Sequence, residues 1–121
     1  MTIWLWLAVA AIGGIGAIGR FVIDALVAAR VGRDFPFGTL TINLTGTLLL
    51  GVLVGAGANG NLYLLAGTAT LGSYTTFSTW MLEIYRLAED TQLRPSVINA
   101  VVSLLLGFGA ALLGRTIGLN L

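Results

Sequence analysis

Long uncharged stretches separated by short charged segments dominate the pattern along this chain. Three stretches carry no charge, residues 1–19, 35–82 and 95–114. About 20 apolar residues cross a bilayer core as an α-helix, so the first and third stretches each fit one crossing and the second fits two. The charged residues that delimit them are Arg20, Asp24, Arg30, Arg33, Asp34, Glu83, Arg86, Glu89, Asp90, Arg94 and Arg115.

This spacing predicts an all-α integral membrane protein with four transmembrane helices, over residues 3–29, 38–54, 62–87 and 95–119. The middle stretch must turn, and we expect the turn in the Gly/Asn-rich segment 55–61, which suits positive φ and the water interface. Both termini then lie on one side of the membrane. The polar segments 30–37 and 89–94 form the loops on the other side.

Composition supports a membrane protein and excludes several functions. The chain of 121 residues is 57% hydrophobic and 9% charged, with mean hydropathy +0.97. A soluble domain carries about 25% charged residues. The absence of Cys and His excludes thiolate and imidazole catalysis and zinc sites, and a net charge of +1 is too weak for a nucleic-acid surface. We expect one domain, residues 1–121, and no enzyme.

The amino end superficially resembles a signal peptide. Ala8-Val9-Ala10 looks like a cleavage site, but a basic n-region is missing and the apolar run continues beyond it. We therefore interpret the amino end as the first membrane helix.

The arginines are distributed unequally between the two sides. The loops after the first and third helices hold Arg30, Arg33, Arg86 and Arg94, whereas the opposite side has Arg115. The positive-inside rule predicts cytoplasmic loops and external termini. Four against one is a small difference, so fixed orientation and insertion in both orientations remain open.

Two polar residues stand inside predicted membrane helices. Arg20 lies well within the first helix, where it needs a partner or a wet cavity. Asp24, one helical turn on, is a candidate partner, and an anion-attracting vestibule is the functional alternative. Asn43 lies in the second helix. It is either a hydrogen-bonding contact between helices or a donor lining a pore.

The segment 68–79 carries eight hydroxyl side chains in twelve residues around Gly72, near the middle of the third helix. Such a run favours a helix broken at mid-membrane, whose freed backbone groups must find partners within the protein or in a wet cavity. Carbonyls freed there could hold a cation. A kinked helix with Ser and Thr bonded back to their own backbone is the alternative.

Further candidates flank this segment. Phe77 and Trp80 share a helix face, where they either pack or present ring edges to an anion. Asn99 and Ser103 form a polar stripe on the fourth helix, and Glu83 suits a cap or a vestibule.

Three motifs resemble the Fluc-type fluoride channels, also called the CrcB family. They are Gly13-x-x-Gly16-Ala17-x-x-Arg20, Phe35-Pro-x-Gly38-Thr-Leu-x-x-Asn43-x-x-Gly46 and Gly72-x-x-Thr75-Thr-Phe-Ser-Thr79, and they cover all but the fourth helix. The resemblance implies a passive channel in the cell inner (plasma) membrane that exports cytoplasmic fluoride and confers fluoride resistance. It also implies an antiparallel dimer with two pores and a structural Na⁺ at its centre, formed as a dual-topology homodimer or with a paralogous partner.

The resemblance also implies roles for single residues. Backbone carbonyls of Gly72 and Thr75 would hold the sodium ion, and Arg20 and Glu83 would lie in a vestibule. Trp80 stands where the family has a second pore phenylalanine, so its indole N–H is a candidate donor. The residues implied for the pore are Asn43, Phe77, Trp80, Asn99, Ser103, Thr39, Ser78 and Thr79.

Two other classes fit four short membrane helices. A small multidrug exporter exchanges protons for cationic drugs through a carboxylate in its first helix, where this chain has Arg20 with Asp24 beside it. A non-conducting scaffold subunit accounts for the hydrophobicity but not for the hydroxyl run.

Overall fold

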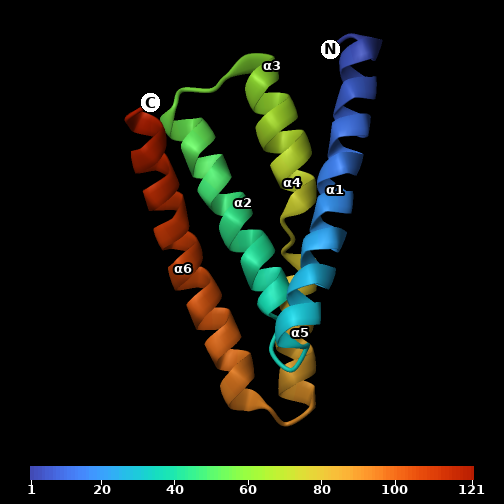
Figure 1. Cartoon of the computed structure of the whole chain (residues 1–121), viewed down its shortest axis with the longest axis vertical. Helices are drawn as coiled ribbons and strands as arrows, with labels where there is room; N and C mark the ends of the chain where they lie inside the picture. Colours follow the sequence, from blue (N-terminus) through green and yellow to red (C-terminus); the bar gives the residue numbers. More distant parts are fainter.

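The computed structural model describes residues 1–121 and is entirely helical, with four rods (Figure 1). Three rods are single helices, and the third is assembled from four consecutive segments. The elements are α1 (Ile3–Val31), α2 (Phe37–Gly55), α3 (Gly60–Leu62), the π-helix η1 (Tyr63–Leu71), α4 (Gly72–Tyr74), α5 (Ser78–Glu89) and α6 (Leu93–Leu119).

The predicted helices and their order are confirmed, with ends that differ by no more than two residues. The fourth helix begins at Leu93, two residues before the expected start at Pro95. Proline fits there because the first helical turn has no intrahelical acceptor for its own N–H groups. Both termini lie at one end of the molecule and the α1–α2 and α5–α6 loops lie at the other, as expected (Figure 1).

The turn between the second and third rods lies where the Gly/Asn cluster predicted it. Helix α2 ends at Gly55, and the chain then passes through Gly57 at φ 79° and Gly60 at φ 56°. These positive φ angles are strained for residues with a Cβ. Glycine therefore permits the reversal that returns the chain along the bundle.

The third rod is interrupted within the segment 68–79, as the hydroxyl run predicted. Gly72 is helical, with φ −63° and ψ −35°, and the chain leaves the helix at Thr75, with φ −79° and ψ 161°. The interruption therefore lies at Thr75–Phe77, directly after the short helix that contains Gly72. The π-helix η1 that precedes it was not anticipated, and Thr70 Oγ1 donates there to the carbonyl of Leu65, five residues back, at 2.7 Å.

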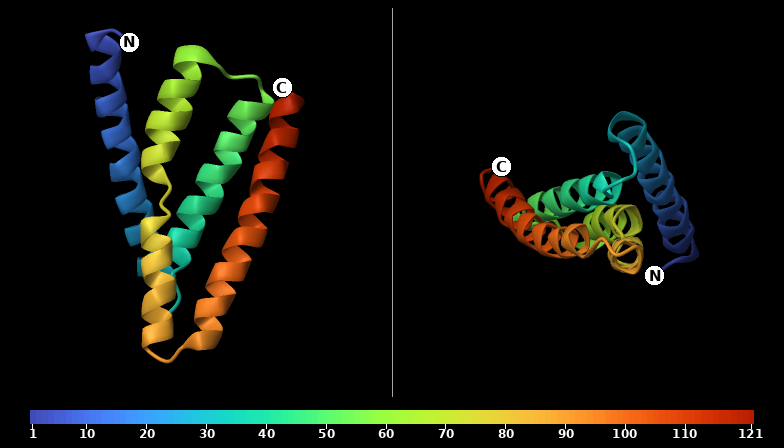
Figure 2. Two further views of the ribbon diagram at one scale, coloured as in Figure 1. Left: turned by 180° about the vertical axis from the view of Figure 1, so that it is seen from behind. Right: turned by 90° about the horizontal axis from the view of Figure 1, so that it is seen from below.

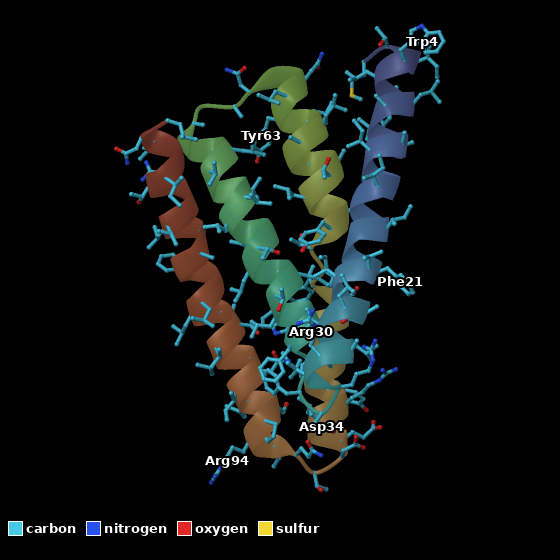
Figure 3. The ribbon with its side chains drawn as sticks, viewed as in Figure 1. Trp4, Phe21, Arg30, Asp34, Tyr63 and Arg94 are labelled. Carbon is cyan, nitrogen blue, oxygen red and sulfur yellow. The ribbon has the colours of Figure 1, made fainter.

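Three helices are long and apolar enough to cross a membrane: α1, α2 and α6. The third rod does not qualify as one apolar helix because it is divided at Thr75–Phe77. Large apolar side chains cover the outside of the molecule, including Trp4 and Phe21, which Figure 3 labels, and Phe108. An outward apolar surface of this kind suits lipid rather than water.

Glycines allow the rods to approach closely. A Cβ added at Gly51 or Gly55 of α2, or at Gly114 or Gly118 of α6, would collide with the backbone of the facing helix. These contacts bring α2 and α6 together near the end that carries the termini (Figure 2). Gly16 of α1 makes the same kind of approach to the carbonyl of Thr70 in η1.

We expect Gly114→Ala to lower the free energy of unfolding by about 1–3 kcal/mol, because its methyl group would overlap the Leu48 carbonyl. The measurement is unfolding of the detergent-solubilised protein by a denaturing detergent. Gly109→Ala, on the same helix with nothing within 4 Å, is the matched control and should be neutral or slightly stabilising. Equal losses in both variants would contradict the interpretation.

Candidate functional site

The break in the third rod is held by a side chain from the second. Asn43 Oδ1 accepts from the Thr76 N–H at 2.8 Å, and Asn43 Nδ2 donates to the Thr76 carbonyl at 2.9 Å. One amide side chain thus satisfies both backbone groups of one residue. The contact between helices considered for Asn43 is therefore present.

Two backbone carbonyls lose their helical hydrogen-bond donors at the break. In a continuous α-helix the Thr76 N–H would donate to the Gly72 carbonyl, but here it donates to Asn43. The Thr79 N–H would likewise donate to the Thr75 carbonyl, but here it donates to Thr76 Oγ1 at 3.2 Å. Gly72 and Thr75 therefore each present a carbonyl oxygen without its helical donor. These two carbonyl oxygens suit a hard cation, which prefers oxygen ligands.

Two further contacts from α2 fix the same segment. The Thr45 and Tyr74 hydroxyls lie 2.9 Å apart, and a Cβ at Gly46 would collide with the methyl group of Thr75. Thr75 Oγ1 bonds back to the Leu71 carbonyl at 2.9 Å, so back-bonding occurs beside the break rather than instead of it. One stretch of α2 thus determines where the third rod opens.

A cavity of about 420 Å³ opens beside the break, and we call it the break cavity. Its lining combines polar side chains with apolar and aromatic ones. The lining residues include Asn43, Thr47, Tyr63, Thr68, Gly72, Thr75, Thr76, Phe77 and Trp80. The cavity therefore brings the predicted pore donor Asn43 together with Phe77 and Trp80. Gly72 and Thr75, the candidate cation ligands, line the same cavity.

Phe77 and Trp80 contact each other, as their spacing predicted. Their ring centroids are 5.6 Å apart, with the planes inclined by 75° in an edge-to-face arrangement. Phe77 remains 68% exposed, whereas the indole Nε1 of Trp80 is buried and has no hydrogen-bond partner. Trp80 thus retains an unused donor beside the break cavity.

A second cavity, of about 360 Å³, lies on the other side of the break, and we call it the inner mouth cavity. It brings together Arg20, Thr39, Thr79 and Glu83, four of the predicted pore and vestibule residues. Thr76 lines both the inner mouth cavity and the break cavity. Thr76, which pairs with Asn43, therefore lies between the two cavities.

The ion pair between Arg20 and Asp24, one of the two alternatives considered for Arg20, is not formed. Asp24 Oδ2 instead accepts from Arg33 Nη1 at 3.2 Å. Gly38, in the first turn of α2, leaves room for the Asp24 carboxylate, and a Cβ there would collide with Asp24 Oδ1. Arg20 has no ion-pair partner and faces the inner mouth cavity, the alternative considered for it.

The polar stripe on α6 is present but faces inward. Ser103 Oγ donates to Asn99 Oδ1 at 3.0 Å, while Asn99 is only 1% exposed and its Nδ2 has no partner. Sequence reasoning missed Ser96, whose hydroxyl donates to the Ile84 carbonyl at 2.8 Å. Its spacing of three and seven residues from Asn99 and Ser103 was the available signal. These residues line none of the cavities described, so a place on the ion path stays a prediction.

Ser78 is exposed at the start of α5. Its hydroxyl lies 3.4 Å from Thr76 Oγ1, at the limit of a hydrogen bond. It lines neither the break cavity nor the inner mouth cavity.

We expect Asn43→Leu to destabilise the break, because it leaves both backbone groups of Thr76 without partners at a cost of about 1–3 kcal/mol each. Amide hydrogen exchange at Thr76 should accelerate, and the free energy of unfolding should fall. Thr47→Val is the matched control, since it removes only a bond to the Asn43 carbonyl within α2. Unchanged exchange at Thr76 in Asn43→Leu would contradict this account of the break.

Comparisons with known proteins find relatives along almost the whole chain. The protein named fluoride-specific ion channel FluC 2 of Mycobacterium bovis is 53% identical over 117 residues, covering 97% of this chain and 93% of that protein. The protein of the same name from Mycolicibacterium paratuberculosis is 54% identical, and the match covers 94% of this chain and 93% of that protein. The protein named fluoride-specific ion channel FluC 1 of Leifsonia xyli subsp. xyli is 40% identical, and the match covers 98% of this chain and 89% of that protein.

The family model described as CrcB-like protein, Camphor Resistance (CrcB), matches residues 7–115. That match spans all four rods and both cavities, including the fourth helix, which the three motifs leave out. The chain belongs to the CrcB family.

Proposed function

We propose that this protein is a passive fluoride-selective channel of the cell inner membrane that exports cytoplasmic fluoride. The observation that carries the proposal is the interruption of the third rod at Thr75–Phe77, with its backbone paired to Asn43 between two cavities that both include polar side chains. The relatives named as fluoride-specific channels support the choice of ion. Nothing in the chain supplies a plausible nucleophile and base for an enzyme.

The chemistry of the cavities suits a small, strongly hydrated anion. Such an ion crosses a membrane only if close donors replace its water, and a full positive charge would hold it too firmly. The donors that remain free at the break are uncharged: the second Asn43 N–H and the hydroxyls of Thr68 and Thr76. Phe77 contributes a ring edge, which carries positive partial charge. Fluoride would move from the inner mouth cavity past Thr76 into the break cavity.

The proposed assembly is an antiparallel dimer with two pores. The break cavity is an open depression on the surface of one chain, and Phe77 beside it is 68% exposed. A second copy would complete its wall. Small residues often let helices approach closely in membrane assemblies. In this chain the glycines of α2 and α6 already pack against the facing helix of the same chain, so they do not supply the contact with the second copy.

A sodium ion at the dimer centre accounts for the freed carbonyls. Buried carbonyls without donors cost several kcal/mol each, so Gly72 and Thr75 need a substitute partner in the membrane. Gly72 is exposed on the single chain, as a ligand shared between two chains must be. The ion would supply positive charge for these oxygens and would be structural rather than transported.

The arginines at the loop end favour one orientation of the single chain in the membrane. Arg30, Arg33, Arg86 and Arg94 lie at the end away from the termini, which favours cytoplasmic loops. An antiparallel dimer needs both orientations. A homodimer of chains inserted both ways and a pair with an oppositely oriented paralogue both satisfy this requirement.

The decisive test is ion efflux from liposomes containing the purified protein, followed with fluoride and chloride electrodes. We expect fluoride to leave rapidly without a proton gradient or a co-substrate, and chloride to stay at the level of protein-free liposomes. A small multidrug exporter would require a proton gradient and a cationic drug, and a scaffold would release neither anion. Either pattern would overturn the proposal.

The same assay tests the aromatic pair. Phe77→Ile keeps bulk but removes the ring edge, so fluoride efflux should fall at least about tenfold, the effect of roughly 1.4 kcal/mol in the barrier. Trp80→Phe should conduct normally, because it restores the family residue. Normal conduction by Phe77→Ile would make the pair a packing contact.

Sodium removal tests the proposed central ion. Exhaustive exchange of sodium for a large organic cation should weaken the dimer or its fluoride conduction, measured by cross-linking yield and efflux. Replacing Gly72 by Leu should have the same effect, whereas Thr75→Val should have little, since the carbonyl rather than the hydroxyl is the ligand. Full conduction and an intact dimer without sodium would rule out the site.

A further inference from the structure

The loop end of the molecule holds another cavity, of about 430 Å³, which we call the outer mouth cavity. Its walls come from the last turns of α1, the α1–α2 loop, the start of α2, α5 and the α5–α6 loop. It shares four charged residues with the inner mouth cavity: Asp24, Arg33, Glu83 and Arg86. The two cavities therefore adjoin at these side chains, and an ion moving from the loop end to the break passes beside them.

The Asp24 carboxylate is held at this passage from two directions. Its Oδ1 occupies the space that Gly38 leaves in the first turn of α2, and its Oδ2 accepts from Arg33 Nη1 at 3.2 Å. The Asp24 side chain is 34% exposed and that of Arg33 is 68% exposed. A negative charge thus stands on the proposed anion path, and Arg33, from the loop, neutralises it.

We propose that the Arg33–Asp24 ion pair sets the electrostatic barrier to fluoride between the two mouth cavities. The inference rests on the proposed channel function. With Arg33 present, the four shared charges sum to zero. Without it they sum to minus one, with Asp24 and Glu83 both facing the path, and a fixed charge of that sign lowers the local concentration of anions.

Folding does not depend on this pair. Ion pairs between solvent-exposed side chains contribute little to stability, and Arg33 lies in the loop beyond the end of α1. Replacing Arg33 by Gln therefore changes the potential on the path while leaving the helices in place. The effect must also decline with ionic strength, because salt screens exposed charges.

The experiment measures the initial rate of fluoride efflux from liposomes in about 10 mM and about 300 mM of an impermeant salt, where the screening length falls from roughly 30 Å to roughly 6 Å. We expect Arg33→Gln to be about threefold slower than wild type in low salt and nearly equal to it in high salt. The double variant Asp24→Asn/Arg33→Gln should regain the wild-type rate. Arg30→Gln is the matched control, since Arg30 lines neither mouth cavity.

The outcomes separate this inference from the function on which it rests. Absence of fluoride efflux from wild-type liposomes would overturn both. Wild-type efflux with an unchanged rate in Arg33→Gln would overturn the inference alone. So would a slow Arg33→Gln rate that neither salt nor the Asp24→Asn change restores, because that pattern indicates a structural role for the loop.

Discussion

The pairing of Asn43 with Thr76 is the interaction on which the rest of the site depends. A chain that leaves its helix between apolar surroundings exposes N–H and C=O groups that lipid cannot satisfy. Asn43 offers one acceptor and one donor to the backbone of a single residue, at 2.8 and 2.9 Å. The interruption is thereby stabilised at one place, and Phe77 and Trp80, directly beyond it, are positioned by the same two bonds.

Glycines let neighbouring groups of the site lie close to the helix backbones. Gly46 admits the Thr75 methyl group beside the break, Gly16 admits the Thr70 carbonyl against α1, and Gly38 admits the Asp24 carboxylate at the mouth. In each case the absent Cβ lets a polar segment lie directly against a helix backbone. Helix approach and site geometry therefore depend on the same residues, and these three glycines belong to the first two of the three motifs.

The sequence predicted local features well and tertiary features poorly. Helix ends follow from charges, Gly and Pro, so they were placed within two residues. The hydroxyl run predicted an interruption within residues 68–79, but its position at Thr75–Phe77 depends on where Asn43 reaches from another helix. The spacing of Arg20 and Asp24 made them neighbours, yet Gly38 and a loop arginine determine the actual partner. Such contacts have no signature in helical periodicity.

Charged and uncharged polar groups occupy different parts of the proposed path. Arg20, Asp24, Arg33, Glu83 and Arg86 surround the mouth cavities, whereas amide, indole and hydroxyl groups surround the break. Charges act over the screening length and attract or repel ions before they lose water. Uncharged donors act only at contact, where they replace that water without trapping the ion. Because salt weakens the first effect and leaves the second, the salt dependence of a variant indicates at which of the two places it acts.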